Sequence, residues 1–197
     1  SQKTINTKFK NTTISTKEFT FIDSCLHMTG SLSKLVEELR IKGTENFQHL
    51  IDEFPNAEER RHLFKKQLYP YDYMISFERF DEEITNINEF YNTLTDELPT
   101  QEEYNNLIII CEQLNITTLG ELHDHYVKLD VILLADVIEN YRKMSINDYK
   151  LDPFHYGTAP AFSYDAMLKY TNAKPELLQD PDMYLFMEQG IRAVSYT

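Results

Sequence analysis

Apolar residues recur three and four positions apart between residues 118 and 144, and this pattern predicts a long amphipathic helix. Its expected core side consists of Val131, Leu134, Ala135, Val137, Ile138 and Tyr141. The same periodicity predicts a helix over 102–115. A third helix is predicted over 31–43, where Ser31 caps the start and Gly43 ends it.

Proline and glycine mark the remaining elements. Thr158 and Pro160 open a predicted helix, and Asp180 with Pro181 opens another that Gly190 ends. The best strand candidate is 18–23, where aromatic and polar residues alternate. The acidic stretch 78–105 is interpreted as a solvated pair of connecting helices. A change of character after Lys150 predicts a domain boundary, with one domain over 1–150 and a second over 151–197.

Composition narrows the class of protein. The chain has 197 residues, of which 42% are hydrophobic and 26% are charged, a balance typical of a globular protein with a core. No apolar run is long enough for a membrane span, so no membrane partner is expected. Two cysteines and no apolar leader favour a reducing, intracellular setting over secretion. The net charge of −13 argues against broad neutralisation of nucleic-acid phosphates.

Tyr126 and Asp130 are the candidate catalytic pair. In a helix they lie one turn apart on the same face. A carboxylate can ligate a divalent cation while a neighbouring phenol orients the attacking water, which suits metal-assisted phosphodiester hydrolysis. Such a pair also occurs on the exposed edge of many ordinary helices, so the pattern alone does not decide between these interpretations.

Nearby ionisable residues are less promising. His123 and His125 point in opposing directions around a helix and do not converge on a metal, so a surface position is expected for both. Asp136 lies too far around the helix to join Asp130. Asp23 follows the predicted strand, where capping of a turn explains it as well as catalysis.

Four segments in order resemble the protein-primed group of family B DNA polymerases. TLGELHDHYVKLDVILLADVIENYRKM, 118–144, is similar to the third exonuclease motif of that group. FIDSCLHMTGSLSKLVEEL, 21–39, is similar to a strand-turn-helix in which a Ser-Leu pair touches the single-stranded primer end; here the pair is Ser24-Cys25. Lys66-Gln-Leu-Tyr69 fits a Lys-x-x-hydrophobic element, and 151–171 with 182–192 resembles the entry to the polymerase module.

The resemblance implies an α/β, helix-rich fold: a partial ribonuclease-H-like exonuclease domain followed by a helical entry to the polymerase module. It implies that Tyr126, Asp130 and Lys66 are catalytic, with Asp130 as a metal ligand. DNA contacts are implied for Ser24, Cys25, Tyr69 and Arg192. The stretch around Arg192 departs from the group, because Gly190 is followed by Ile-Arg-Ala-Val-Ser where the group has paired glycines.

The resemblance also implies partners and a cofactor for the complete enzyme. These are Mg²⁺ or Mn²⁺, single-stranded primer DNA with its template, deoxynucleotides, and a terminal protein as a possible primer. The resemblance places the group's other metal-binding motifs, an Asp-x-Glu pair among them, upstream of residue 1, so they are not expected within these 197 residues. Because a two-metal site needs several converging carboxylates, this chain by itself is expected to be inactive.

Two alternatives stay open. The departures at Cys25 and around Arg192 fit a decaying mobile-element copy as well as a tolerated variant. The chain is also interpretable as a non-enzymatic helical interaction module whose acidic 78–105 surface contacts a basic partner.

Overall fold

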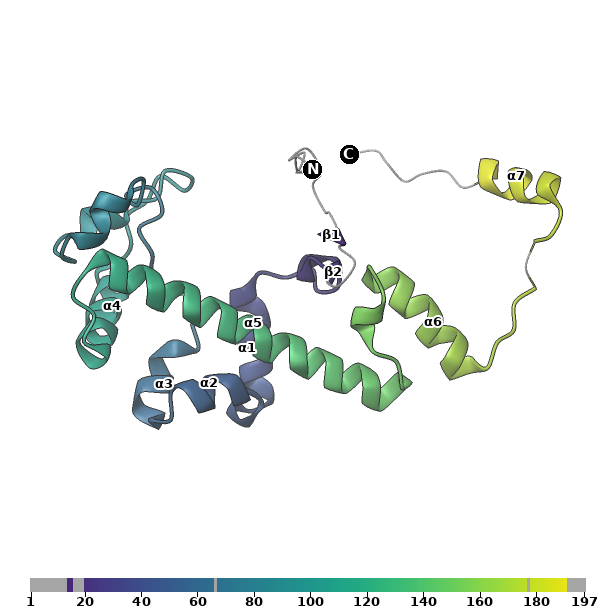
Figure 1. The fold of residues 1–197 in the computed structure, drawn as a ribbon, viewed down its shortest axis with the longest axis horizontal. Coiled ribbons are helices and arrows are strands. Elements are labelled where there is room, and N and C mark those ends of the chain that lie inside the picture. Colours follow the sequence, from purple (N-terminus) through teal and green to yellow (C-terminus); the bar gives the residue numbers. More distant parts are fainter. Residues whose placement is uncertain (1–13, 16–19, 66, 177, 191–197) are drawn as a thin grey trace, which may run out of the picture.

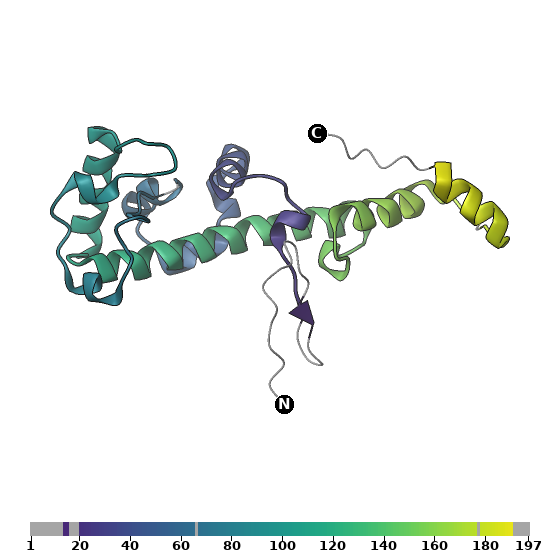
Figure 2. The same cartoon turned by 90° about the horizontal axis from the view of Figure 1, so that it is seen from above.

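One long helix organises the molecule. The computed structural model describes residues 14–15, 20–65, 67–176 and 178–190. Helix α5 (Leu119–Tyr149) is 31 residues long, roughly 46 Å, and runs through the middle of the molecule in Figures 1 and 2. Helices α1 (Leu32–Lys42), α2 (Gln48–Glu53) and α6 (Ala159–Thr171) contact it, as do two short 3₁₀ turns, η3 (Phe77–Asp81) and η5 (Pro153–His155).

Local capping sets most helix ends. Ser31 Oγ accepts the Lys34 N–H at the start of α1, and Gly43 ends that helix at a φ of 137°. Capping boxes start α4 (Gln101–Leu114) at Thr100 and α5 at Thr118. Lys150 ends α5 in the left-handed conformation. The predicted helices over 31–43, 102–115 and 118–144 are therefore confirmed, the last one extended by five residues.

The C-terminal helices follow the proline signals. Helix α6 starts after the Thr158 cap, and α7 runs from Pro181 to Gly190, as predicted. In Figures 1 and 2, α7 lies at the far end of the molecule from α4, beyond α6. Its apolar side chains are 51% to 71% exposed; these are Met183, Tyr184, Leu185, Phe186 and Met187. Helix α7 thus adds nothing to the described core.

Strand structure is minimal in the described part of the chain. Strand β1 (Ile14–Ser15) pairs antiparallel with β2 (Thr20–Phe21). The strand predicted over 18–23 is present only at Thr20 and Phe21, and residues 18–19 lie outside the described residues. The helix-rich part of the fold prediction is confirmed. A ribonuclease-H-like arrangement and a domain boundary at 150 stay predictions.

The acidic stretch 78–105 is not a pair of helices, so that interpretation was wrong. It forms η3, a second 3₁₀ turn η4 (Ile87–Phe90) and loops, before α4 begins at Gln101. Asparagine side chains explain the difference. Asn86 and Asn92 each bond a backbone N–H two residues ahead, which competes with helical hydrogen bonds.

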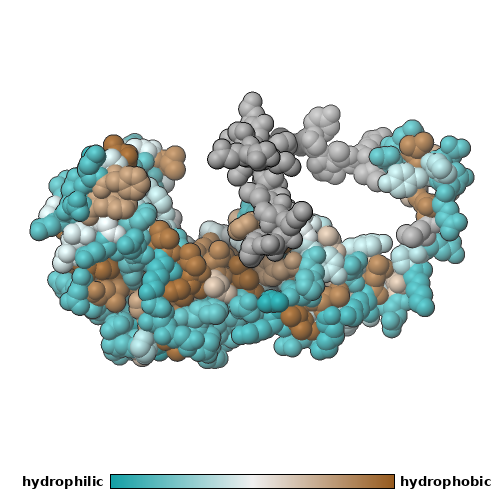
Figure 3. Space-filling view, viewed as in Figure 1, coloured by the Kyte–Doolittle hydropathy of each residue, from teal (hydrophilic) through white to brown (hydrophobic). Residues whose placement is uncertain are grey.

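Two apolar clusters form the core. The larger joins α1, α2 and α3 (Ala57–Leu63) to the middle of α5; its most buried residues include Phe47, Leu50, Leu63, Leu129 and Leu133. The smaller joins α4 and the start of α5, through Phe90, Leu107, Cys111, Leu119 and Leu122. Space-filling atoms show apolar residues gathered along the middle of the molecule, over α5 and α1 (Figure 3). None of the helices in the described ranges combines the length and apolar character needed to cross a membrane.

The predicted core side of α5 is confirmed at Val137 and wrong at Val131, and the other four predicted residues are half-buried: Leu134, Ala135, Ile138 and Tyr141. Val137 is buried, whereas Val131 is 61% exposed. The buried residues of α5 are Leu119, Leu122, Tyr126, Leu129, Leu133, Asp136, Val137 and Ser145. Apolar residues occupy two sides of α5, and periodicity does not say which side α1 and α2 cover. The other side leaves Val127 and Val131 facing solvent.

A buried carboxylate fixes α2 against α5. Asp136 is 1% exposed, and its two oxygens accept the N–H groups of His49 and Leu50 at 2.9 and 3.0 Å. The cap residue of α2, Phe47, provides no side-chain cap, so Asp136 supplies it from another helix. One turn further along α5, Asn140 Nδ2 donates to the Asn46 carbonyl at 2.7 Å. These bonds set the position of α2 along α5.

Replacing Asp136 with alanine should destabilise the fold. The variant leaves two backbone donors of α2 without their acceptor, so we expect its free energy of unfolding to fall by about 2–4 kcal/mol. Asp136→Asn keeps one acceptor oxygen and should lose about half as much. Chemical denaturation followed by circular dichroism measures both. Asp124→Ala, an exposed position on the same helix, is the control and should change stability by less than about 0.5 kcal/mol. Equal losses at 124 and 136 would contradict this role.

His125 should make stability depend on pH. Its Nε2 is buried without a hydrogen-bond partner among the described residues, and its ring meets Phe54 edge-on. Burial, and then the nearby Lys128, lower the pKa of His125 below its ordinary 6.5. As the pH falls below 6.5, the unfolded chain therefore binds more protons than the folded one. The contribution of His125 to stability is present above this pH and is lost as the pH falls towards the folded pKa.

The measurement compares the free energy of unfolding at about pH 7.5 with that at about pH 5.5, in the wild type and in His125→Leu. The variant should lose less stability between the two values. His49→Leu changes an exposed histidine of α2 and should retain the wild-type loss. An unchanged pH dependence in His125→Leu would refute the assignment.

Candidate functional site

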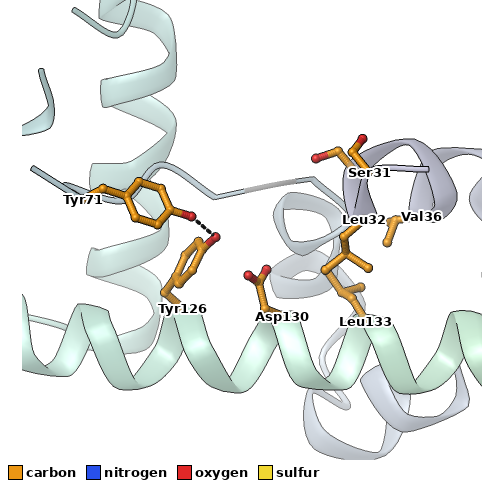
Figure 4. A pocket seen from close by; sticks show the side chains of 8 residues that line it. Ser31, Leu32, Val36, Tyr71, Tyr126, Asp130 and Leu133 are labelled. Carbon is orange, nitrogen blue, oxygen red and sulfur yellow. Dashed lines mark hydrogen bonds between the residues drawn. The ribbon is translucent and has the colours of Figure 1, made fainter. Parts of the chain in front are cut away.

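A pocket of about 230 Å³ lies between α5 and the start of α1. Tyr126, Asp130 and Leu133 form its α5 side, and Ser31, Leu32, Ser33 and Val36 form its α1 side. Tyr71 completes the lining from the loop before η3. Figure 4 shows the Tyr126 hydroxyl and the Asp130 carboxylate on the same side of α5. The predicted pairing of these two residues on one face is therefore present in the structure.

Asp130 stands at the margin of the core. Leu129 and Leu133 on one side of it are buried, while Val127 and Val131 on the other side are 45% and 61% exposed. Tyr126 is 8% exposed, so most of its ring belongs to the core. Tyr71 is 54% exposed. The pocket is thus open to solvent on its Tyr71 side and closed by apolar side chains beneath.

An aromatic cluster holds Tyr126 in place. Its ring stacks on Tyr69 with 4.7 Å between the centroids and meets Tyr71 edge-on. The hydroxyl oxygens of Tyr71 and Tyr126 lie 2.5 Å apart in a hydrogen bond in which either can donate. The Tyr69 hydroxyl lies 2.7 Å from Nδ1 of His123, one turn before Tyr126 on α5. These contacts restrain the direction in which the Tyr126 hydroxyl points.

A close backbone approach supports this cluster from the other side. Phe80 of η3 lies on the His123 ring, with 5.1 Å between the centroids. A Cβ at Gly120 would come within 2.9 Å of the Phe80 carbonyl oxygen, so only glycine lets η3 approach α5 this closely. The Leu119 N–H donates to the Glu82 carbonyl nearby.

The environment keeps Tyr126 protonated. Burial, the hydrogen bond with Tyr71 and the neighbouring Asp130 carboxylate all raise the pKa of Tyr126 well above its ordinary 10.0. Burial and the proximity of Tyr71 also raise the pKa of Tyr69. Both phenols therefore act at neutral pH as hydrogen-bond donors or acceptors and not as anions.

The first turn of α1 faces the same pocket. Ser31 is the cap of this helix, and Ser31, Leu32 and Ser33 line the cavity. A helix start presents unpaired N–H groups and a partial positive charge, which favour anions such as phosphate. Across the pocket from Asp130, the first turn of α1 thus contributes two serine side chains and no carboxylate.

The donor set does not make up a metal site on its own. Among the residues that the structure describes, Asp130 is the single carboxylate that lines the pocket. Over the described ranges, no group of three or more His, Cys, Asp or Glu side chains converges in a way that could hold a metal ion. A divalent cation at Asp130 would need further carboxylates from outside these residues.

The predicted site residues fall into three groups. Tyr69, Tyr126 and Asp130 lie together at the pocket and its aromatic wall. Ser24 and Cys25, in the 3₁₀ turn η1 (Ser24–Leu26), do not line it. His27, three residues after Ser24, instead packs near Tyr141, which is roughly 16 Å along α5 from Asp130. Lys66 and Arg192 lie outside the described residues.

Neighbouring predictions had mixed outcomes. Asp136 caps α2 and does not line the pocket, in agreement with its exclusion. Asp23 accepts the Cys25 N–H and caps η1, as the turn interpretation requires. The surface position expected for the two histidines was wrong, because both rings are half-buried. They do diverge: His123 meets Tyr69, whereas His125 meets Phe54.

Sequence reasoning missed Tyr71, Ser31 and Ser33 as pocket residues. The density of tyrosines in LYPYDYM was a usable signal for an aromatic wall, but nothing local showed which ring would meet Tyr126. The sequence predicts Ser31 only as a helix cap. Its second role depends on α1 crossing α5 at Asp130, which is a tertiary contact. Comparisons of the chain with protein-family models, curated proteins and solved structures return no match.

Substitutions at Tyr126 should separate its ring from its hydroxyl. Tyr126→Phe keeps the stacking on Tyr69 and loses one hydrogen bond, so we expect a loss of about 1 kcal/mol in the free energy of unfolding. Tyr126→Ala removes a largely buried ring and should cost about 3–5 kcal/mol. Urea unfolding measures both variants. Equal losses in the two variants would contradict this, because they would mean that burial of the ring adds nothing to the stability that the hydroxyl provides.

Proposed function

We propose that this chain forms one wall of a 3′–5′ exonuclease site in a DNA polymerase of the protein-primed family B group. The observation that carries the proposal is the shared pocket of Tyr126, Asp130 and the first turn of α1. The ordered resemblance of four segments points to the same function. In the complete enzyme the site would shorten a mismatched single-stranded primer end by hydrolysis.

The state of Tyr126 suits a water-positioning role. Its raised pKa keeps the hydroxyl protonated, and the aromatic cluster restrains its direction. A fixed, neutral phenol next to a carboxylate can hold a water molecule in line with a phosphodiester. The Tyr71 hydroxyl is hydrogen-bonded to that of Tyr126. It would either bind the same water or give up this bond so that the Tyr126 hydroxyl binds the water.

The α1 wall suits the phosphate. Ser31 and Ser33 line the pocket across from Asp130, and their hydroxyls with the unpaired N–H groups of the first turn would donate to a phosphate bound there. Donors fixed before the reaction stabilise negative charge that develops on phosphate oxygens. The partial positive charge at the start of α1 would favour a phosphate at this one point of a chain whose net charge is −13.

The metal would be shared with another part of the enzyme. Asp130 would supply one ligand to Mg²⁺ or Mn²⁺, and carboxylates outside the described residues would supply the others. The resemblance assigns Lys66 to stabilising negative charge, and Ser24, Cys25, Tyr69 and Arg192 to DNA. The same parent would bind template and deoxynucleotides and extend a primer, with a terminal protein as one possible source of that primer.

Exonuclease assays on the complete product of the gene test the proposal. A 5′-labelled single-stranded oligonucleotide should be shortened from its 3′ end only when Mg²⁺ is present. Loss of a residue that only hydrogen-bonds a metal ligand already lowers activity roughly 10- to 100-fold, so Asp130→Asn, which changes a ligand, should lower the rate at least roughly 100-fold. Tyr126→Phe should lose roughly 100-fold. The 197-residue chain alone should show no activity.

Matched variants control for structural effects. Asp124→Asn removes an exposed carboxylate from the same helix, and Tyr149→Phe removes a phenol hydroxyl far from the pocket. Both should keep the wild-type rate. Full activity in Asp130→Asn, or the same loss in Asp124→Asn, would refute the assignment of Asp130.

A further inference from the structure

A second and larger cavity, about 640 Å³, lies on the other side of Tyr71. We call it the α4 groove. One wall comes from the segment after α3, with Lys65 and Tyr69; the other comes from the loop before α4 and its first turns, with Tyr91, Glu97, Leu98 and Glu102. Tyr71 lines both this groove and the pocket around Asp130.

The groove is negatively charged. Asp72, Glu97, Glu102 and Glu103 line it, against Lys65 and His62 at one end. The Asp72 carboxylate accepts a hydrogen bond from the Thr93 N–H. The Glu103 carboxylate accepts one from the Thr100 N–H and so completes the capping box of α4. The side chains of Glu97 and Glu102 make no hydrogen bond or ion pair with any other described residue. Two carboxylates are therefore available to a ligand.

Aromatic and apolar surface lies beside these carboxylates. The rings of Tyr69 and Tyr91 line the groove, and Leu98 on its rim is 47% exposed. Leu94 of the same loop is 95% exposed. Faces of tyrosine rings next to carboxylates attract ammonium and guanidinium groups, and exposed leucines attract apolar neighbours of such groups.

The molecule already holds one cation in this way. The Arg79 guanidinium carbon lies 3.8 Å from the centroid of the Tyr73 ring, and its Nη1 lies 3.6 Å from a Glu82 oxygen. Arg79 is also the single basic residue among nine acidic ones between residues 78 and 105. The surroundings of the groove therefore favour a cationic ligand and repel a phosphate chain.

We propose that the α4 groove binds an extended, basic peptide segment. An arginine or lysine side chain would lie between Glu97 and Glu102 against the tyrosine rings, and an apolar residue next to it would contact Leu98. This inference does not rest on the exonuclease proposal, because it uses different residues and a different cavity.

Fluorescence anisotropy on the 197-residue chain tests the inference. The probe is a labelled synthetic peptide of about ten residues in which arginine and leucine alternate. Its affinity should fall steeply with added salt. The same peptide with glutamate for arginine, and a labelled single-stranded oligonucleotide, should bind at least about tenfold more weakly.

Paired variants distinguish the groove from diffuse charge. Glu97→Gln with Glu102→Gln should weaken peptide binding at least about tenfold, and Leu98→Ser should weaken it as well. Glu78→Gln with Glu83→Gln removes the same charge from the same acidic stretch outside the groove, and should change affinity by less than about twofold. Equal losses in the two pairs, or a preference for the oligonucleotide, would overturn the inference. Circular dichroism verifies that each variant is folded.

Discussion

The burial of one face of α5 is the constraint on which the rest of the structure depends. Helices α1, α2 and α6 and two 3₁₀ turns pack against this helix. Short pieces such as α2, with six residues, are not stable helices alone and gain their stability from this packing. The Asp136 carboxylate fixes where α2 lies, and the position of α1 then decides which side chains meet Asp130. The candidate site is thus a consequence of how the core of α5 is covered.

Features encoded within a few residues could be predicted from the sequence. The ends of α1 and α6 follow from Ser31, Gly43 and Thr158, each of which acts on its own helix. The pairing of Tyr126 with Asp130 is of the same kind, because one helical turn joins them. Asp136 is different: its hydrogen-bond partners His49 and Leu50 are more than eighty residues away. No local pattern distinguishes such a cap from a solvent-exposed aspartate.

Two further mismatches have physical causes in the chain. Apolar residues on both sides of α5 made its core face ambiguous, and the structure selects the side of Leu129 over that of Val131. In 78–105, asparagine caps and a left-handed residue at Asp96 outweigh the helix propensity of the acidic side chains. The resemblance implied that Ser24 contacts the primer end, but among the described residues Ser31 and Ser33, not Ser24, line the pocket of Tyr126 and Asp130. The resemblance covers the whole segment 21–39, but it does not say whether the turn with Ser24 or the first turn of α1 reaches α5.

Tyr71 connects the two cavities physically. Its hydroxyl bonds Tyr126 on the Asp130 side, and its ring meets Tyr69, which lines the α4 groove. A ligand that moved Tyr71 from the groove side would therefore break the hydrogen bond that restrains the Tyr126 hydroxyl. Because the Tyr71 side chain cannot occupy two positions at once, a ligand in one cavity would change the affinity of the other cavity for its ligand. Thermodynamic linkage requires the change in affinity to be the same in both directions. Half-exposed Tyr71, rather than the buried Tyr126, is the residue through which such coupling would act.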